Sequence, residues 1–199
     1  MEQREMWNKI SEHWKEFREK PLKEVSDFLK GKKGKILDLG AGSGRHMVKM
    51  NAEFYEVDFS EKMLELGKKK AQKEEIKAQF VRAEAWDLPF DDDFFDSAIF
   101  IAALHCIPDE KKRKKSLEEL HRVLKKKGKA MITVWGRKSE RIKNRPKETT
   151  IPWMVEGEKY QRYCYIYDPE ELKNAINKTG FKIISFEEKE NLVAVVEKE

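Results

Sequence analysis

The sequence predicts an α/β fold in which a mainly parallel sheet is covered by helices on both faces. Short apolar runs alternate with amphipathic segments over most of the 199 residues, and this alternation is typical of strands joined by helical crossovers. A glycine-rich segment at 40–44 follows the first apolar run, at the kind of turn where such sheets bind a ligand. The length suits a single domain, 1–199, with a core of its own.

The first 30 residues predict a helical cap on this domain. Trp7, Ile10 and Trp14 fall at helical spacing, and Pro21 is placed to open a second helix. We therefore expect one or two helices before the first strand.

The remaining elements follow from local patterns. Seven apolar runs predict strands, and the last two form a closing pair: 35–39, 54–58, 79–83, 95–101, 130–135, 181–187 and 191–197. Helices are expected just after Gly44, from the N-cap Ser60 to Lys70, over 111–127 before Gly128, and after Asp168 and Pro169. Residues 136–167 form a long connection, which in a compact domain is usually functional or disordered. We expect it to be an insert on the substrate side.

Charge is abundant and unevenly distributed. The chain has 42 Lys and Arg against 37 Asp and Glu, a net charge of +5, and its wealth of Lys and Glu predicts a thermophile protein. Residues 136–150 carry six cationic and two anionic side chains, and residues 111–115 are all basic. Such clusters suit an RNA phosphate backbone, although a solvated lysine surface produces the same pattern.

Composition also argues against several classes of protein. No run approaches the roughly 20 apolar residues of a membrane-spanning helix, and the N-terminus has no apolar signal core. Cys106 and Cys164 form no C-x-x-C pair, which argues against a zinc ribbon or a disulfide scaffold. We therefore expect a cytoplasmic protein that holds no metal and binds no membrane.

The glycine-rich segment Asp38-Leu39-Gly40-Ala41-Gly42-Ser43-Gly44 follows a strand and opens the next element. Glycines there allow a sharp turn and let a ligand approach the main chain. Asp58 ends the second strand, where a carboxylate accepts both hydroxyls of a ribose. A dinucleotide site has the pattern G-x-G-x-x-G, whereas the third glycine here comes one residue early and an acid stands two residues before the first. An adenosine-type cofactor without a pyrophosphate is favoured.

This segment resembles motif I of the class I S-adenosylmethionine-dependent methyltransferases. The run Glu84-Ala85-Trp86-Asp87-Leu88-Pro89-Phe90 is similar to that family's acid after the third strand and its Leu-Pro-Phe turn, with Glu84 where Asp is more usual. The resemblance implies a Rossmann-like, seven-stranded, mostly parallel sheet with a reversed final strand, and S-adenosyl-L-methionine as cofactor. The cofactor-binding residues it implies are Trp7, Asp38, Gly40, Ala41, Gly42, Gly44, Asp58, Phe59, Met63, Glu84, Ala85, Trp86 and Ile101.

A narrower resemblance covers nearly the whole chain. The tRNA wobble-uridine carboxymethyl methyltransferases open with aromatic-Asn-x-Ile and then Arg-x-Lys-Pro, as residues 7–10 and 18–21 do here. Their fourth strand ends Ala-x-x-His, as residues 102–105 do, and a Pro-Trp pair and an Arg-Tyr segment correspond to 152–153 and 162–163. The chain departs from the family in having Cys106 where a second His is common, Tyr165 where His is usual, and Leu22 in place of Trp.

In that family a carboxylate on the uridine side chain attacks the sulfonium methyl group and becomes a methyl ester. A carboxylate is already deprotonated near neutral pH, so the site must supply orientation rather than a base. The resemblance implies that Arg18 grips the acceptor carboxylate and that Lys20 and His105 help hold the acceptor or its phosphate. The substrate-binding residues it implies are Arg137, Arg141, Arg145, Trp153, Arg162, Tyr163 and Tyr165. The implied partners are tRNA and a small zinc-ribbon activator.

Other functions share the same cofactor site. A methyltransferase for a quinone or polar metabolite would use it with a different acceptor, and for an amine or hydroxyl acceptor His105 would be the candidate base. A regulatory subunit that binds cofactor without turnover, or an NAD enzyme, is a further alternative. The basic run at 136–150 favours the tRNA acceptor.

Overall fold

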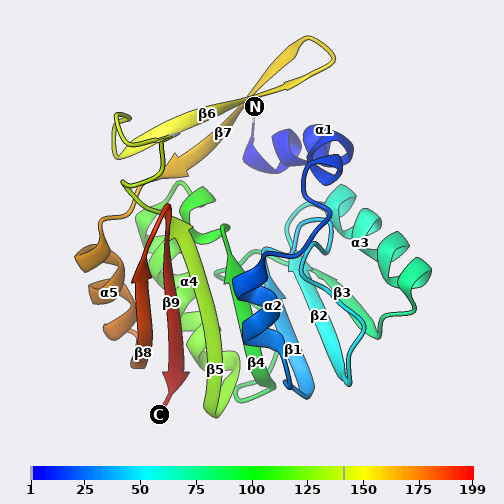
Figure 1. Ribbon diagram of the computed structural model, residues 1–199, viewed down its shortest axis with the longest axis vertical. Helices are drawn as coiled ribbons and strands as arrows, with labels where there is room; N and C mark the ends of the chain where they lie inside the picture. The colour runs from blue at the N-terminus through cyan, green and yellow to red at the C-terminus, as the bar shows by residue number, and fades with distance from the viewer. Residues whose placement is uncertain (1, 141) are drawn as a thin grey trace.

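The computed structural model describes residues 2–140 and 142–199, and its centre is a seven-stranded sheet (Figure 1). The strand order is β3-β2-β1-β4-β5-β9-β8, and β9 runs antiparallel to both of its neighbours. The strands are β1 Gly34–Leu39, β2 Ala52–Asp58, β3 Ala78–Arg82, β4 Phe95–Ile101, β5 Leu124–Trp135, β8 Phe181–Glu188 and β9 Asn191–Lys198. The predicted fold class, with its reversed final strand, is confirmed.

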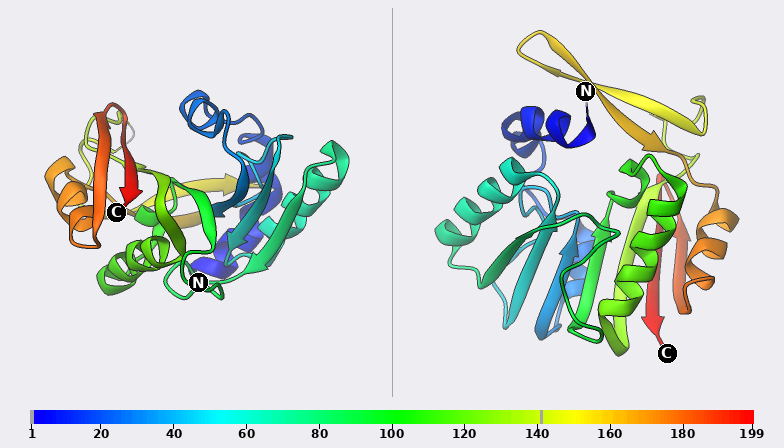
Figure 2. Two further views of the ribbon diagram at one scale, coloured as in Figure 1. Left: turned by 90° about the horizontal axis from the view of Figure 1, so that it is seen from below. Right: turned by 180° about the vertical axis from the view of Figure 1, so that it is seen from behind.

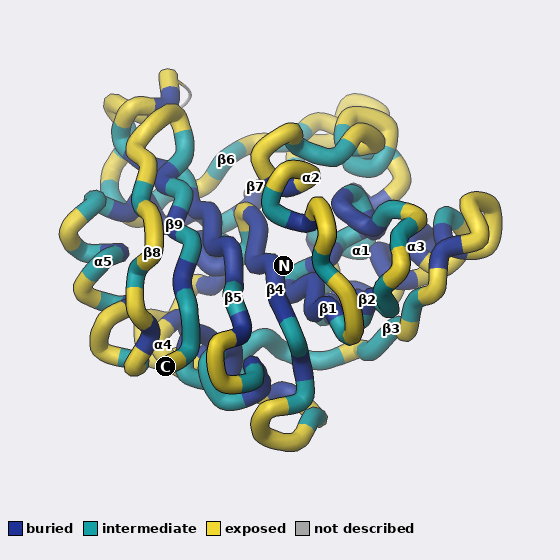
Figure 3. Tube along the Cα trace, turned by 60° about the horizontal axis from the view of Figure 1, so that its bottom comes forward, coloured by how far each residue is buried: buried dark blue, intermediate teal, exposed yellow. Residues whose placement is uncertain are grey.

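Helices cover both faces of the sheet, as alternating strands and helices require (Figure 2). The helices are α1 Gln3–Glu16, α2 Lys23–Leu29, α3 Glu61–Glu74, α4 Glu110–Val123 and α5 Pro169–Asn177. Leu120 of α4 and Ile176 of α5 pack with Phe100 on one face, whereas Leu29 of α2 packs with Phe54 and Ile99 on the other. Buried positions run along the middle strands β4 and β5, and the outer loops are exposed (Figure 3).

The helix expected after Gly44 is absent, and this prediction was wrong. Residues 40–51 connect β1 to β2 as a turn, because so short a crossover leaves no room for a helix and its return. A side chain supplies the donors that a helix would have provided. Lys70 Nζ of α3 donates to the carbonyl oxygens of Gly44 (2.7 Å), Arg45 (3.3 Å) and Met47 (2.9 Å).

Two further boundaries differ from the sequence prediction. The helix expected over 111–127 ends at Val123, because Leu124 already pairs with Phe95 of β4 and so begins β5. A register shift between Phe95 and Ser97 accommodates the extra residues of β5, and Lys127 there adopts a left-handed φ of 64°. The strand expected at 130–135 therefore begins six residues earlier.

The long connection at 136–167 contains a hairpin that the sequence prediction missed. Strands β6, Glu148–Val155, and β7, Glu158–Tyr165, form a separate two-stranded antiparallel sheet. The two turn residues, Glu156 and Gly157, both have positive φ (49° and 84°), which is the geometry of the two-residue turns that close hairpins. The hairpin lies beyond the carboxyl ends of the central strands, beside α1 (Figure 1).

A short 3₁₀ helix, η1 Leu104–Cys106, follows β4 at the same edge of the sheet. None of the described helices is long and apolar enough to cross a membrane.

Replacing Lys70 with Met should destabilise the protein by about 2–4 kcal/mol, because three carbonyl groups lose a charged donor and a buried group of acids loses its nearest cation. Urea denaturation monitored by circular dichroism measures the change. Lys69→Met on the exposed face of the same helix is the control and should stay within about 0.5 kcal/mol of the unaltered protein. Equal midpoints for the two variants would show that Lys70 does not hold the turn.

Candidate functional site

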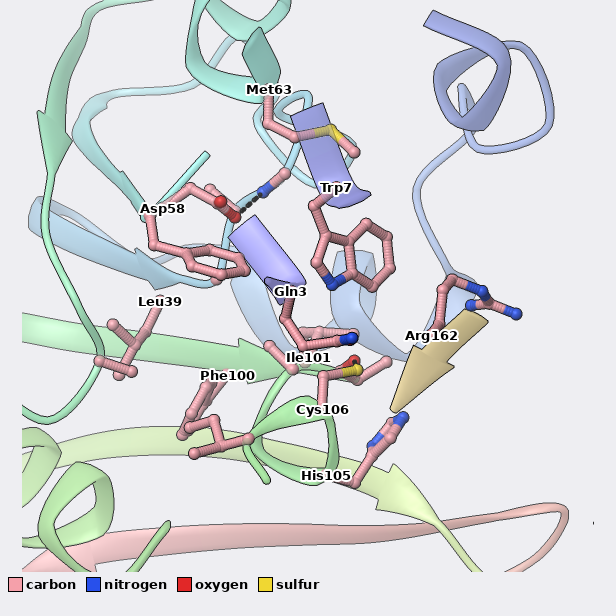
Figure 4. A pocket seen from close by; sticks show the side chains of 18 of the residues that line it. Gln3, Trp7, Leu39, Asp58, Met63, Phe100, Ile101, His105, Cys106 and Arg162 are labelled. Atoms are coloured by element: carbon pink, nitrogen blue, oxygen red, sulfur yellow. Dashed lines mark hydrogen bonds between the residues drawn. The ribbon is translucent and has the colours of Figure 1, made fainter. Parts of the chain in front are cut away.

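A cavity of about 700 Å³ opens at the carboxyl ends of β1, β2 and β4. Its floor is the turn after β1, and α1 forms its roof. Trp7 and Gln3 of α1 project into the cavity between Asp58 on one side and Arg162, His105 and Cys106 on the other (Figure 4). Because the carboxyl edge of a parallel sheet is where α/β folds bind ligands, this cavity is the candidate site.

Asp58 holds the floor of the cavity together. Its carboxylate accepts hydrogen bonds from the main-chain N–H of Gly42 (2.9 Å) and of Ser60 (2.8 Å), so it joins the glycine turn to the start of α3. Burial raises the pKa of Asp58 to about 6, and these two main-chain donors oppose the shift. Glu84 lines the same end of the cavity, and burial also raises the pKa of its carboxyl group.

Most of the predicted cofactor residues line this cavity. They are Trp7, Gly40, Ala41, Gly42, Asp58, Phe59, Met63, Glu84, Ala85, Trp86 and Ile101. Gly40 has a φ of +72°, and a Cβ there would stand 2.4 Å from Cβ of Ala103, so only glycine fits against the strand-end segment.

Asp38 and Gly44 do not line the cavity, so their predicted direct contact with the cofactor is not supported. Gly44 is needed for the turn itself, since its φ is +74° and a Cβ there would lie 2.9 Å from Cε of Met47 and 3.3 Å from Oε2 of Glu56. Asp38 is 1% exposed and lies behind the turn. It is opposite Glu56 in the register of β1 and β2.

Asp38 and Glu56 form a buried carboxyl pair that sequence reasoning missed. Neither oxygen of Glu56, nor Oδ2 of Asp38, has a hydrogen-bond partner among the described residues. Burial, followed by repulsion from Asp58, raises the pKa of Asp38 to about 8, and burial followed by repulsion from Asp38 raises that of Glu56. Lys70 partly offsets both shifts. The pair therefore holds at least one proton near neutral pH, as neighbouring buried acids do.

Helix α1 is anchored as the roof of the cavity by Asn8. Asn8 Oδ1 accepts a hydrogen bond from Ser60 Oγ (2.7 Å), and the N–H of Lys62 lies 3.4 Å away at the start of α3. At its other side, Gln3 accepts from the N–H of Tyr163 (2.9 Å) and donates to the carbonyl of Gln161 (3.3 Å) in β7. The helix thus spans from α3 to the hairpin, and Trp7 lies between these two anchors.

Arg162 of β7 lines the opposite end of the cavity. It is 7% exposed, and its guanidinium lies over the rings of Trp14 (4.8 Å), Trp153 (5.2 Å) and Trp7 (5.8 Å). Stacking on indole faces stabilises a buried guanidinium and fixes its plane. The predicted substrate residue Arg162 is therefore presented to the cavity on a rigid support.

His105 also lines this end, but its surroundings argue against a role as a base. It is 2% exposed, its ring stacks on Trp135, and its Nδ1 lies 3.4 Å from the N–H of that residue. Burial, followed by the positive charge of Arg162, lowers the pKa of His105 to about 3. A group with so low a pKa is neutral at pH 7 and accepts a proton poorly. Cys106 beside it remains a neutral thiol, because burial raises its pKa to about 12.

The structure separates Arg18 from Lys20. Arg18 lines the cavity, and its guanidinium lies 4.9 Å from the ring centre of Trp14. Lys20 is exposed and lies outside the cavity lining, so its predicted role at the acceptor is not supported. Its carbonyl oxygen instead accepts a hydrogen bond from Arg45 Nε (2.7 Å). Arg45, which directly follows the glycine turn, lines the cavity and was not among the predicted residues.

The predicted base-stacking aromatics have other contacts. Tyr165 is only 9% exposed, and its hydroxyl hydrogen-bonds to Glu171 of α5, so it is a core residue and its predicted contact with substrate is not supported. Tyr163 does not line the cavity and lies beside Arg113. Trp153 packs on Trp14 at 4.8 Å and supports Arg162 rather than reaching the cavity itself.

The basic segment 136–150 is largely neutralised by acids. Arg137 pairs with Asp168 and donates to the carbonyl of Arg145, and Arg145 donates to the carbonyl of Thr150. Further ion pairs join Lys138 to Glu188, Lys143 to Glu140, and Lys147 to both Asp168 and Glu171. Neither Arg137 nor Arg145 lines the cavity, and Arg141 lies outside the described residues.

The second basic run, 111–115, is also partly structural. Arg113 is 4% exposed and donates to the carbonyls of Ile107 and Pro108, and its guanidinium lies 3.9 Å from the ring centre of Tyr165. Lys112 reaches the cavity, over the ring of Trp86. Arg113 therefore joins the hairpin to the segment that follows η1, and the run does not present a uniform cationic surface.

Comparison with known proteins agrees with this geometry. Residues 37–132 match a family described as a methyltransferase domain. The fold matches a solved S-adenosylmethionine-dependent methyltransferase from Methanosarcina mazei, with a TM-score of 0.76 over 90% of this chain and 98% of the other, at 21% identity. The chain therefore has the fold of the S-adenosylmethionine-dependent methyltransferases, and about half of its length matches the methyltransferase family model. Both findings agree with the predicted enzyme class and with S-adenosylmethionine as the cofactor.

The similar proteins include enzymes that are named for two different acceptors. A tRNA (carboxymethyluridine(34)-5-O)-methyltransferase from Arabidopsis thaliana is 33% identical over 68% of this chain and 33% of its own length. One from Schizosaccharomyces pombe is 25% identical over 90% of this chain and 88% of its own length. A demethylmenaquinone methyltransferase from Clavibacter sepedonicus is 41% identical over 49% of this chain and 40% of its own length. The chain thus spans well under half of the Arabidopsis and Clavibacter proteins.

A second solved structure with a similar fold is a complex of two proteins. It is the complex between the Haloferax volcanii Trm112 methyltransferase activator and the putative methyltransferase, which matches with a TM-score of 0.70 over 96% of both chains at 15% identity.

The cavity residues fit S-adenosylmethionine. At one end the carboxyl groups of Asp58 and Glu84 face an otherwise apolar wall that includes Leu39, Met63 and Ile101. Carboxylates there suit the hydroxyl and amine donors of an adenosine and would repel a pyrophosphate. Asp58 and Glu84 would hold the nucleoside, and Trp7 would close over it.

Replacing Asn8 with Ala should weaken binding of S-adenosylhomocysteine about 3- to 10-fold, because α1 loses the hydrogen bond that fixes Trp7 over the cavity. Isothermal titration calorimetry measures the affinity. Asn8→Asp keeps an acceptor oxygen for Ser60 and should bind almost as tightly as the unaltered protein. If the Ala variant binds equally well, the roof does not depend on Asn8.

The carboxyl pair predicts an unusual pH dependence of stability. Because the pKa values of Asp38 and Glu56 are raised in the folded state, the folded protein holds protons that the unfolded chain has released between about pH 4 and 8. The free energy of unfolding should therefore fall as pH rises through that window, and Glu56→Gln should flatten the fall. Urea denaturation at pH 5 and pH 8 tests this, with Glu65→Gln on exposed α3 as control; equal slopes would contradict it.

Proposed function

We propose that this protein transfers a methyl group from S-adenosylmethionine to the carboxylate of a carboxymethyl-type modified wobble uridine in tRNA, and so forms the methyl ester. The observation that carries the proposal is Arg162, a buried guanidinium held on three tryptophan rings at the end of the cavity opposite Asp58. A planar guanidinium binds a carboxylate through two parallel hydrogen bonds.

The chemistry needs little from the protein beyond placement. The bound cofactor supplies an electrophilic methyl group on its sulfonium. The acceptor carboxylate is deprotonated at neutral pH, so no proton has to be removed. Arg162 orients the carboxylate, and the neutral rings of His105 and Trp135 form a wall beside it. Alignment of this kind supplies much of the rate of a bimolecular transfer.

The low pKa of His105 supports this acceptor over a hydroxyl or amine. Those groups need a base to remove a proton, and His105 was the candidate. Its burial and the contact of its Nδ1 with the N–H of Trp135 leave it a weak base. A carboxylate acceptor does not need one.

The tRNA assignment draws on the relatives that act on carboxymethyluridine, one of which matches 90% of the chain. The ion pairs within 136–150 weaken the prediction that this segment as a whole binds RNA. The cationic side chains that line the cavity give better support for an RNA substrate than this segment does.

The second candidate is methylation of a quinone, which the 41% identical demethylmenaquinone methyltransferase favours. A quinone-type acceptor is uncharged and would make no use of the guanidinium that Arg162 presents to the cavity. We also propose a small activator as partner, on the model of the Haloferax complex, and the assay below is therefore run with and without one.

Arg162→Gln should lower kcat/KM for tRNA that carries carboxymethyluridine by about 100-fold, because the acceptor carboxylate loses a charged, bidentate partner. Labelled cofactor and mass spectrometry of the tRNA nucleosides measure the transfer. Binding of S-adenosylhomocysteine should change less than threefold. Lys159→Gln, at an exposed position of the same strand, is the matched control and should remain fully active. Labelling of another nucleoside, or of a quinone alone, would overturn the assignment.

A further inference from the structure

Arg45 is a cavity residue to which the sequence motifs give no role. It directly follows the glycine turn, and the carbonyl of Lys20 fixes its Nε at 2.7 Å. That carbonyl belongs to the short segment between α1 and α2, so the Arg45 guanidinium is held between the floor of the cavity and this segment. Arg18, two residues before Lys20 in the same segment, lines the cavity as well.

The two guanidinium groups affect each other electrostatically. Burial, and next the positive charge of Arg18, lower the pKa of Arg45, while Glu24 opposes the shift. The neighbouring His46 is 5% exposed, and its pKa is lowered to about 3 by burial and then by Arg45 and Lys70, so it adds no charge at neutral pH. Two like charges beside one cavity favour an anion between them.

The charges of the residues that line the whole cavity also favour an anionic ligand. Among the described lining residues, five are cationic and four anionic: Arg4, Arg18, Arg45, Lys112 and Arg162 against Glu2, Asp58, Glu84 and Glu190. His46 and His105 are neutral at pH 7, since their pKa values lie near 3. The walls therefore carry one net positive charge.

The cofactor adds a second positive charge. Its sulfonium and ammonium groups are positive and its carboxylate is negative, so the net charge of the cofactor is positive with its own carboxylate included. A neutral acceptor would leave two positive charges in a partly closed cavity, and a single carboxylate would leave one. An acceptor with two negative charges matches this count of the described lining side chains.

The charges are also divided along the cavity. Glu84 is influenced by Glu2, Arg4 and Lys112, so these four side chains cluster at the end that also holds Asp58. Arg18, Arg45 and Arg162 remain for the rest of the cavity, where Glu190 is the one acid among the described lining residues. Among the lining side chains, the cationic ones therefore outnumber the acids on the side away from Asp58.

We propose that Arg45 and Arg18 form a phosphate subsite, which takes a phosphodiester group of the RNA chain next to the acceptor nucleotide while Arg162 takes its carboxylate. The inference rests on the proposed function and sharpens it, because the acceptor becomes a nucleotide within a chain rather than a free nucleoside. A phosphodiester has two free oxygens, and each guanidinium can donate to one of them.

Binding measurements test the subsite without turnover. Protein loaded with S-adenosylhomocysteine is titrated with 5-carboxymethyluridine and with its 3′- and 5′-monophosphates, by calorimetry. The unaltered protein should bind one of the monophosphates at least tenfold more tightly than the nucleoside, and Arg45→Ala should remove that advantage while leaving nucleoside affinity within twofold. Arg45→Lys keeps the charge and should retain part of the advantage. Lys49→Ala, an exposed position after the same turn, is the control and should leave it intact.

Two results would overturn the proposal. If nucleoside and monophosphates bind alike, no phosphate subsite exists. If Arg45→Ala weakens S-adenosylhomocysteine but not 5′-methylthioadenosine, which lacks the amino-acid end, the anion bound is the cofactor's carboxylate.

Failure of the proposed function is seen separately. If uridine 3′- or 5′-monophosphate binds with the same Arg45-dependent advantage over uridine, but carboxymethyl groups add nothing and are not methylated, the phosphate subsite stands and the carboxylate acceptor is wrong.

Discussion

The site depends above all on the carboxylate of Asp58. One oxygen accepts from the glycine turn at Gly42 and the other from Ser60 at the start of α3. Ser60 in turn donates its hydroxyl proton to Asn8 of α1. A single buried acid at the end of β2 therefore links the floor of the cavity to its roof. The residues on both sides of the cavity are thus positioned relative to the same strand end.

The missing helix between β1 and β2 explains why side chains take on so much of this task. A helix would satisfy the main-chain groups of residues 40–51 internally. Here Asp58 accepts from the turn on the cavity side, and Lys70 donates to three of its carbonyls from α3. Lys70 also lowers the cost of burying Asp38 and Glu56 beside each other. The turn is thus held between a carboxylate and an ammonium group rather than by a helical hydrogen-bond ladder.

Sequence reasoning identified what depends on local pattern. Spacing and residue type were enough to predict the strands and the fold class. They also predicted the glycine turn, Asp58 and Glu84, which the structure brings together at one edge of the sheet. Sequence reasoning failed where the decisive contact is between distant residues. Nothing local marks Asn8 as a partner of Ser60, or Glu56 as the neighbour of Asp38 across two strands. The hairpin was missed because its Glu156-Gly157 turn is a weaker signal than Asn-Gly or Asp-Gly. The contribution of segment 136–150 to RNA binding was overestimated, because acids far along the chain, such as Glu188, form ion pairs with it.

Helix α1 couples the two ends of the cavity. Trp7 lines the end of the cavity near Asp58, and Trp14, two turns later on the same helix, supports both Arg18 and Arg162. A helix of this length moves as one body, so a ligand that fixes Trp7 also fixes Trp14 and hence the planes of the guanidinium groups. Gln3 and the contact between Trp153 and His13 tie the same helix to the hairpin that carries Arg162. Under the proposed function, a cofactor that fixes Trp7 would therefore also fix the guanidinium groups proposed to orient the acceptor, through the rigid packing of α1.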